Sequence, residues 1–325
     1  MRKVYIGALA AALGCIDGDV DPGRVAHQSQ ASTADCRVQT LEWGTGAGQL
    51  GYQPPAPERA ARAPQSLAIR GGEVVVLDNV RGRVVGVDGE GRVRPVASNL
   101  HPSVEDVAVG PDGALAVYSP LEASVEVFAP DGKSIGTVAV PRALRGVARI
   151  ELGESRRVYA YSAFQERHTL GSPAAPLVLD SVLRSKLEGA WRFGADRSVV
   201  AVASSEQVDL RILRAPGNGE RAQLSHELTI PGRANAAQVV GGHDSTVCLR
   251  TESIDRESTV VEVSRRLVCA DLEDGRWLLD RPLAAPAPFV PRREVAVAGT
   301  ADKLITAALE ATDSGLRITR CEVAR

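Results

Sequence analysis

Short apolar runs separated by glycine-rich turns recur along the chain from residue 36 onward. The clearest units cover 66–92 and 106–133, where residue 66 of the first matches residue 106 of the second and residue 74 matches residue 115. Each unit has three apolar runs, and turns such as Gly110-Pro111-Asp112-Gly113 separate them. Strand–turn–strand units that repeat about every 40 residues predict the blades of a β-propeller.

Weaker copies of this pattern begin near residues 146, 191, 238 and 295. With the two clear units they predict an all-β propeller of about six four-stranded blades over 36–325, with seven blades as the alternative. The run 37–41 precedes the first unit, and we expect it to close the ring as a strand of the last blade. The segment 177–187 has helical spacing and is interpreted as a short helix or an irregular insert.

Two stretches resemble NHL-repeat propellers: the blade core 67–84, and the opening turn Trp43-Gly44-Thr45-Gly46-Ala47-Gly48-Gln49-Leu50. Two blades carry the resemblance clearly, whereas the other units share only its hydrophobic pattern. The resemblance implies the fold and leaves the activity open, because one fold hosts many functions.

The first fifteen residues have the order of an export signal. Arg2 and Lys3 precede a mainly apolar run, 4–13, which is too short to cross a bilayer core about 30 Å thick as a helix. Gly14-Cys15 follows and resembles the lipobox of bacterial lipoproteins, which implies that Cys15 is lipidated and becomes the first residue of the mature chain. The run departs from that pattern, since Ala12 and Leu13 stand where the family prefers Leu and then a small residue. Plain secretion and an uncleaved start therefore remain alternatives.

Residues 16–35 are polar and contain little apolar surface, so we predict a flexible tether there. Asp17, Asp19 and Asp21 imitate the start of a calcium loop, but Pro22 and Gln28 occupy positions that need Gly and Glu. The expected location is the cell envelope, lipid-anchored in the periplasm or on the outer-membrane surface, with secretion as the alternative.

Four cysteines remain after Cys15, and an even set fits two disulfides in an oxidising compartment. Cys36 starts the predicted closing strand and Cys321 lies in the final strand, so pairing of these strands brings the two within disulfide reach. Cys248 and Cys269 stand symmetrically about a polar turn near residue 258, which favours a bridge across one hairpin. Unpaired buried thiols are the alternative, and no pair has the CxxC spacing of a zinc site.

No motif in the chain indicates catalysis. Gly132-Lys133-Ser134-Ile135-Gly136 matches the GxSxG pattern of hydrolases, but an apolar strand pattern follows it where a hydrolase has a helix, so we interpret it as a turn. The five histidines are widely spaced and form no metalloprotease motif.

Six-bladed propellers include calcium-dependent lactonases, which gather acidic and amide side chains around one ion in the central channel. The residues near the starts of the innermost strands are the candidates for lining this channel here: Gln65, Ser66, Glu105, Asp106, Arg145, Asn235, Arg293 and Glu294. Glu105, Asp106 and Asn235 carry oxygen ligands for a cation. Arg145 and Arg293 would repel a cation, so we expect no metal or cofactor, and channel charges that pair with one another.

The net charge of −2 and the pI near 6.3 provide no basic field for nucleic acid. The sequence therefore predicts a monomeric, non-catalytic binding scaffold that recognises a protein, peptide or glycan of the envelope or the extracellular space through its face loops. Contact with a membrane is expected only through the lipid. The alternative is a calcium-dependent, lactonase-like hydrolase.

Overall fold

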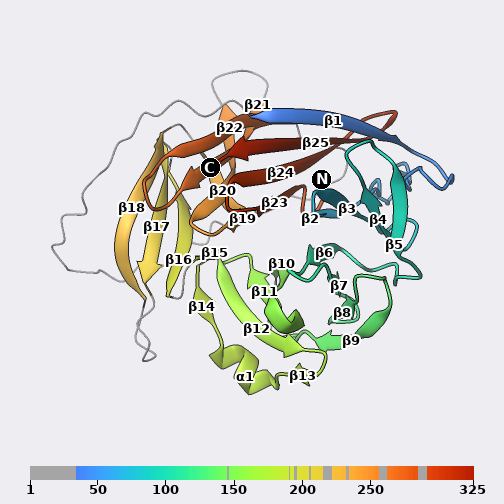
Figure 1. Cartoon of the computed structure of the whole chain (residues 1–325), viewed down its shortest axis with the longest axis horizontal. Helices are drawn as coiled ribbons and strands as arrows, with labels where there is room; N and C mark the ends of the chain where they lie inside the picture. Colours follow the sequence, from blue (N-terminus) through green and yellow to red (C-terminus); the bar gives the residue numbers. More distant parts are fainter. Residues whose placement is uncertain are drawn as a thin grey trace.

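The computed structural model describes residues 34–144, 146–189, 191–193, 196–204, 206–214, 222–231, 234–255, 262–284 and 291–325. Within them, six antiparallel sheets stand around a common centre (Figure 1), which confirms the prediction of a six-bladed β-propeller. Residues 1–33, which hold the predicted signal, Cys15 and nearly all of the tether, lie outside the described residues.

The first three blades follow one another along the chain, and each begins with its innermost strand. Blade 1 contains β2 (Ser66–Arg70), β3 (Glu73–Asp78), β4 (Arg83–Val87) and β5 (Val93–Ala97). Blade 2 contains β6 (Asp106–Val109), β7 (Leu115–Ser119), β8 (Ser124–Phe128) and β9 (Ser134–Ala139). Blade 3 contains β10 (Val147–Leu152), the 3₁₀ helix η1 (Glu154–Arg156), β11 (Val158–Ser162), β12 (Glu166–Ser172), β13 (Ala175–Pro176), α1 (Leu179–Arg184) and β14 (Leu187–Glu188).

The last three blades have longer strands. Blade 4 contains β15 (Trp191–Phe193), β16 (Arg197–Ala203), β17 (Gln207–Arg214) and β18 (Gln223–Pro231). Blade 5 contains β19 (Ala236–His243), β20 (Thr246–Asp255), β21 (Glu262–Asp271) and β22 (Trp277–Leu283). Blade 6 contains β23 (Val295–Gly299), β24 (Lys303–Ala311) and β25 (Gly315–Ala324), and β1 (Asp35–Glu42) completes it.

The ring closes as the sequence predicts. Strand β1 pairs antiparallel with β25 and places Cys36 directly opposite Cys321, with which it forms a disulfide. Of the side chains on β1 only Leu41 is buried, so this strand is held by its backbone pairing and by the disulfide more than by apolar packing. Cys248 and Cys269 form the second disulfide across the β20–β21 hairpin, as predicted, and both are fully buried.

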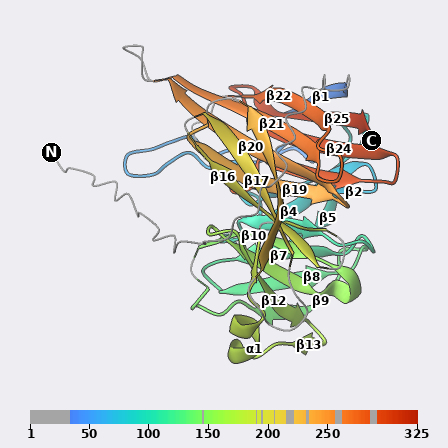
Figure 2. The same cartoon turned by 90° about the vertical axis from the view of Figure 1, so that its left-hand side faces the viewer.

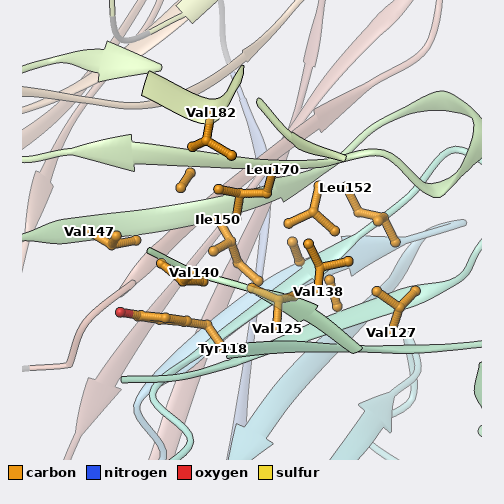
Figure 3. Packing of buried hydrophobic residues seen from close by; sticks show 14 of the residues in the cluster. Tyr118, Val125, Val127, Val138, Val140, Val147, Ile150, Leu152, Leu170 and Val182 are labelled. Carbon is orange, nitrogen blue, oxygen red and sulfur yellow. The ribbon is translucent and has the colours of Figure 1, made fainter. Parts of the chain in front are cut away.

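Aliphatic side chains fill the space between neighbouring blades. Figure 3 shows one such cluster, in which Val125 and Val138 of blade 2 pack against Ile150 and Leu170 of blade 3. Each of these side chains is fully buried, and burial of this kind contributes about 1.5–3 kcal/mol per side chain.

The insert predicted over 177–187 contains the one-turn helix α1, which anchors Val182 in this same cluster (Figure 3). It lies at the opposite end of the molecule from β1 and β25 (Figures 1 and 2). No helix in the described ranges is both long and apolar enough to span a bilayer.

Candidate functional site: the start face and its polar hub

The six innermost strands define the two faces of the ring. We call the face at which β2, β6, β10, β15, β19 and β23 begin the start face. Because each sheet is an antiparallel meander, its second strand ends beside the beginning of its first; Asp106 of β6, for example, pairs with Tyr118 of β7. The turns that follow the second strands, and the connections between blades, therefore lie on the start face.

A buried carboxylate at this face joins four blades. Asp106, the first residue of β6, is fully buried, and its Oδ1 accepts a 2.7 Å hydrogen bond from the Ser66 hydroxyl of β2. Its Oδ2 accepts hydrogen bonds of 2.7 Å from the backbone N–H of Ile150 on β10 and from Nη2 of Arg293, which precedes β23. We call Ser66, Asp106, Ile150 and Arg293 the polar hub.

The two charges of the hub, on Asp106 and Arg293, compensate each other. Burial lowers the pKa of Arg293, and the charge of Asp106 opposes this effect. Arg293 also donates to the carbonyl oxygen of Ile150 at 2.6 Å, and Ser66 accepts from the backbone N–H of Val107 at 3.2 Å. Removal of one member of such a buried pair costs about 3–5 kcal/mol, because the other charge is left uncompensated.

A second ion pair lies directly beside the hub. Arg292 pairs with Glu105 and donates to the carbonyl oxygen of Val147, and its guanidinium lies 5.2 Å from the centre of the Tyr118 ring. Burial raises the pKa of Tyr118, with the nearby Arg292 charge opposing. The sequence reasoning did not single out Arg292, although the adjacent Arg292-Arg293 pair before the last innermost strand was the available signal.

Blade 3 adds a further polar group that the sequence reasoning missed. The Tyr161 hydroxyl donates a 2.6 Å hydrogen bond to Glu151, and the guanidinium of Arg149 lies 3.9 Å from the centre of the Tyr161 ring. Burial, and then the charge of Glu151, raise the pKa of Tyr161. The hydroxyl therefore stays protonated and acts as a hydrogen-bond donor.

The other predicted channel residues have different outcomes. The Asn235 Oδ1 accepts a 2.6 Å hydrogen bond from the backbone N–H of Ile254 on β20, so its amide serves its own blade and is not part of the hub. Arg145 lies outside the described residues. Arg293 was expected to repel a cation, and in the structure it compensates the charge of Asp106.

These contacts bear on the calcium-dependent alternative. Both Asp106 oxygens already accept hydrogen bonds, and the Glu105 carboxylate pairs with Arg292. Among the described residues, no three His, Cys, Asp or Glu side chains gather where they could hold a metal ion. The described carboxylates of Asp106 and Glu105 are therefore engaged by neighbouring groups of the protein.

The GxSxG match begins in the hairpin turn between β8 and β9 and continues into β9. Gly132 adopts a φ of +85° in the turn before β9, and the Ser134 hydroxyl donates to Glu126 on the neighbouring strand β8. The match therefore belongs to a turn and the strand that follows it in a regular sheet, which agrees with its interpretation as a turn between strands.

Three cavities open on the start face. One of about 500 Å³ lies between blades 1 and 2 and is lined in part by Gln65, Asn79, Ser103, Glu105 and Leu121. Another of about 300 Å³ lies beside α1 in blade 3, and a third of about 310 Å³ lies between blades 5 and 6. Two large apolar side chains, Leu121 and Phe164, project from turns of this face, each with 76% of its surface exposed.

The cavity between blades 1 and 2 contains a polar atom without a partner. Asn79 is only 6% exposed, yet its Oδ1 accepts no hydrogen bond. Leaving a buried polar group unpaired costs about 1–3 kcal/mol.

Several of the described turns on the far face are short and contain an aspartate that accepts hydrogen bonds from the backbone of its own turn. Asp88 accepts from the backbone N–H groups of Glu90 and Arg92 between β4 and β5, and Asp131 accepts from that of Lys133 between β8 and β9. Asp112 and Asp271 form the same kind of bond in the β6–β7 and β21–β22 turns. The side-chain hydrogen bond from Arg92 lowers the pKa of Asp88 most, so this carboxylate is satisfied within its turn.

The fold and the ring closure define the protein as a six-bladed β-propeller. No protein-family model and no curated protein matches the chain.

Among solved structures, the chain is similar to the PQQ-bound aldose sugar dehydrogenase of Streptomyces coelicolor, with 14% identity over 90% of this chain and 100% of that chain and a TM-score of 0.48. Virginiamycin B lyase of Staphylococcus aureus shares 9% identity over 88% of this chain and 99% of that chain, with a TM-score of 0.45. A member of the DUF4221 family from Bacteroides vulgatus shares 7% identity over 90% of this chain and 98% of that chain, also with a TM-score of 0.45. At these values none of the three bears on the activity of this chain.

Proposed function

We propose that the chain is a non-catalytic recognition protein of the cell envelope, which binds a protein, peptide or glycan through the loops and cavities of its start face. The difference between the two faces carries the proposal. The described far-face turns around Asp88 and Asp131 satisfy these aspartates internally, whereas the start face has cavities, the highly exposed side chains of Leu121 and Phe164, and an unpaired buried amide oxygen. Exposed apolar groups and concave surfaces rimmed by polar residues are typical of binding sites.

The state of the hub supports a binding role over a catalytic one. A general acid or base needs a proton-accepting or proton-donating atom that can reach a substrate. Both oxygens of Asp106 are engaged by the protein, and the hub links blades 1, 2, 3 and 6. Its role is to hold four blades in fixed positions, so that the loops of the start face present a pre-organised surface.

Location in an oxidising compartment belongs to the same proposal. Two disulfides are typical of exported proteins, since cytosolic thiols are kept reduced. We further propose that the mature chain starts at a lipidated Cys15 and carries NHL-like blades on the tether 16–35. Labelling of cells with a fatty-acid analogue tests the anchor: the Cys15→Ser variant is expected to lose the label, and an equally labelled variant would remove the anchor from the proposal.

Site-specific photo-crosslinking in intact cells tests the binding face. A photoreactive residue at Leu121 or Phe164 on the start face is expected to form adducts with a partner. Glu90 and Asp131 are matched controls, because both are exposed in turns of the far face. Adducts that form equally at all four positions, or only at the two controls, would contradict the assignment of the start face.

A further inference from the structure

The cavity between blades 5 and 6 contains an arginine whose charge nothing in the described structure compensates. Arg281 lies on β22, the outermost strand of blade 5, and lines this cavity together with Arg265, Leu283, Glu294 and Leu309. Its Nε and Nη2 atoms are buried, and among the described residues they have no hydrogen-bond partner and the guanidinium has no ion pair. Burial lowers the pKa of Arg281, and no carboxylate opposes this effect.

The acidic groups around the cavity are already engaged by other arginines. Glu294 is 8% exposed and pairs with both Arg250 and Arg265. Arg265 and Arg250 also contact Glu252, so these two arginines balance two glutamates. At the cavity rim Glu310 pairs with Arg317. Arg281 therefore contributes one positive charge that the described side chains leave unbalanced.

We propose that this cavity binds a carboxylate group of a peptide segment, with Arg281 as the residue that receives it. A guanidinium donates charge-assisted hydrogen bonds to carboxylate oxygens, and Arg281 lines this cavity. A single negative charge fits better than a phosphate dianion, because two glutamates, Glu294 and Glu310, also line the cavity. Leu283, Leu309 and Pro291 offer apolar contacts to the groups that flank the carboxylate. This inference rests on the proposed function, since it names the chemistry that one part of the start face recognises.

The test uses defined small molecules with the whole oxidised protein, so it needs no knowledge of the partner. N-acetyl-leucine supplies a terminal carboxylate with an apolar neighbour, and the α-amide of N-acetyl-aspartate supplies a side-chain carboxylate. N-acetyl-leucinamide is the uncharged control, and inorganic phosphate is the competing anion. Binding is measured at constant ionic strength from the rise in the unfolding temperature with ligand concentration.

We expect at least one of the two carboxylates to stabilise the wild type and N-acetyl-leucinamide to have no effect. In Arg281→Met the affinity should fall by about 10- to 100-fold, as expected for loss of charge-assisted hydrogen bonds. Arg266→Met is the matched control, because Arg266 lies on the neighbouring strand β21 and is paired with Asp280. This variant should keep the wild-type affinity.

A second readout separates binding from a structural role. Removal of an unpaired buried charge should raise the unfolding temperature of the unliganded Arg281→Met variant, whereas loss of a structural arginine would lower it. The proposal is overturned if neither carboxylate binds the wild type, if Arg281→Met binds as well as the wild type, or if phosphate binds more tightly than both carboxylates. None of these results depends on whether Leu121 and Phe164 crosslink to a partner. The proposal that the start face binds a partner can therefore hold even if this cavity binds no carboxylate.

Discussion

The disulfide between Cys36 and Cys321 should stabilise the propeller more than the disulfide between Cys248 and Cys269. The first bond spans a sequence separation of 285 residues and the second spans 21. A cross-link restricts the unfolded chain more when the loop that it closes is longer. The first bond also fixes β1, which buries little apolar surface of its own, to the last strand of the ring.

The chain-entropy relation gives the expected size of this difference. With the two sequence separations as loop lengths, the closing bond contributes about 5.6 kcal/mol to the free energy of unfolding and the hairpin bond about 3.3 kcal/mol. The difference of about 2.3 kcal/mol corresponds to a change of about 50-fold in the folding equilibrium.

Two variants isolate the two bonds. Cys248→Ala/Cys269→Ala retains only the closing bond, and Cys36→Ala/Cys321→Ala retains only the hairpin bond. Each protein is unfolded in denaturant in its oxidised and its reduced form, and the difference between the two forms is the contribution of the remaining bond. Any cavity left by a substitution is common to both forms and cancels. A closing-bond contribution equal to or smaller than that of the hairpin bond would refute the argument from loop length.

Three further predictions concern single side chains. Asp106→Asn should lower the free energy of unfolding by about 3–5 kcal/mol, because Arg293 loses its buried counter-charge. Ser66→Ala should lower it by only about 1 kcal/mol. Equal losses in denaturant unfolding would contradict this ranking. The Gln165 amide links blades 3 and 4: it donates to the carbonyl oxygen of Ala201 and accepts from the backbone N–H of Ala201, both at 2.8 Å. Gln165→Leu should therefore speed hydrogen exchange of the Ala201 amide. Unchanged protection of this amide would argue against the link. Burial raises the pKa of Asp78 above 3.8 against the opposing effect of Arg83, so the folded chain takes up this proton at a higher pH than the unfolded chain. Lowering the pH through that interval should therefore stabilise the wild type relative to Asp78→Asn, and a difference in unfolding free energy that stays flat or decreases with acid would refute the sign.

Local pattern was sufficient to predict the strands of this protein. The runs around residues 66–78 and 106–119 became β2, β3, β6 and β7, because a short, almost continuously buried apolar run bounded by turn residues is a property of a few consecutive residues. Ring closure was predictable for a related reason: Cys36 and Cys321 lie in the first and last strands, and a propeller commonly closes by pairing these two strands in one blade. The helix in the insert also followed from spacing, since apolar residues recur at Leu179, Val182 and Leu183, and Val182 is the buried one.

Contacts between blades could not be predicted in this way. Ser66 and Asp106 occupy matching positions in two successive repeats, but the sequence does not state that these side chains face each other across the ring centre. The hub depends on the angle between neighbouring blades, which is set by packing along the whole ring. Blade 3 shows the same limit of prediction from sequence. Both β13 and β14 pair with β12 there, and the repeat pattern gives no signal for either short strand.

Unpaired buried polar groups support the proposal that the start face binds a partner. Asn79 Oδ1 and two nitrogen atoms of Arg281 are buried in cavities of this face without hydrogen bonds. Each such group costs the free protein about 1–3 kcal/mol, and more where the group is charged. A fold under selection for stability alone would satisfy them, as the far-face aspartates are satisfied within their own turns. A partner whose polar groups reach Asn79 or Arg281 on binding would recover part of this free energy. The hub and the disulfides hold the blades together, so little of that gain would be lost to ordering of the ring.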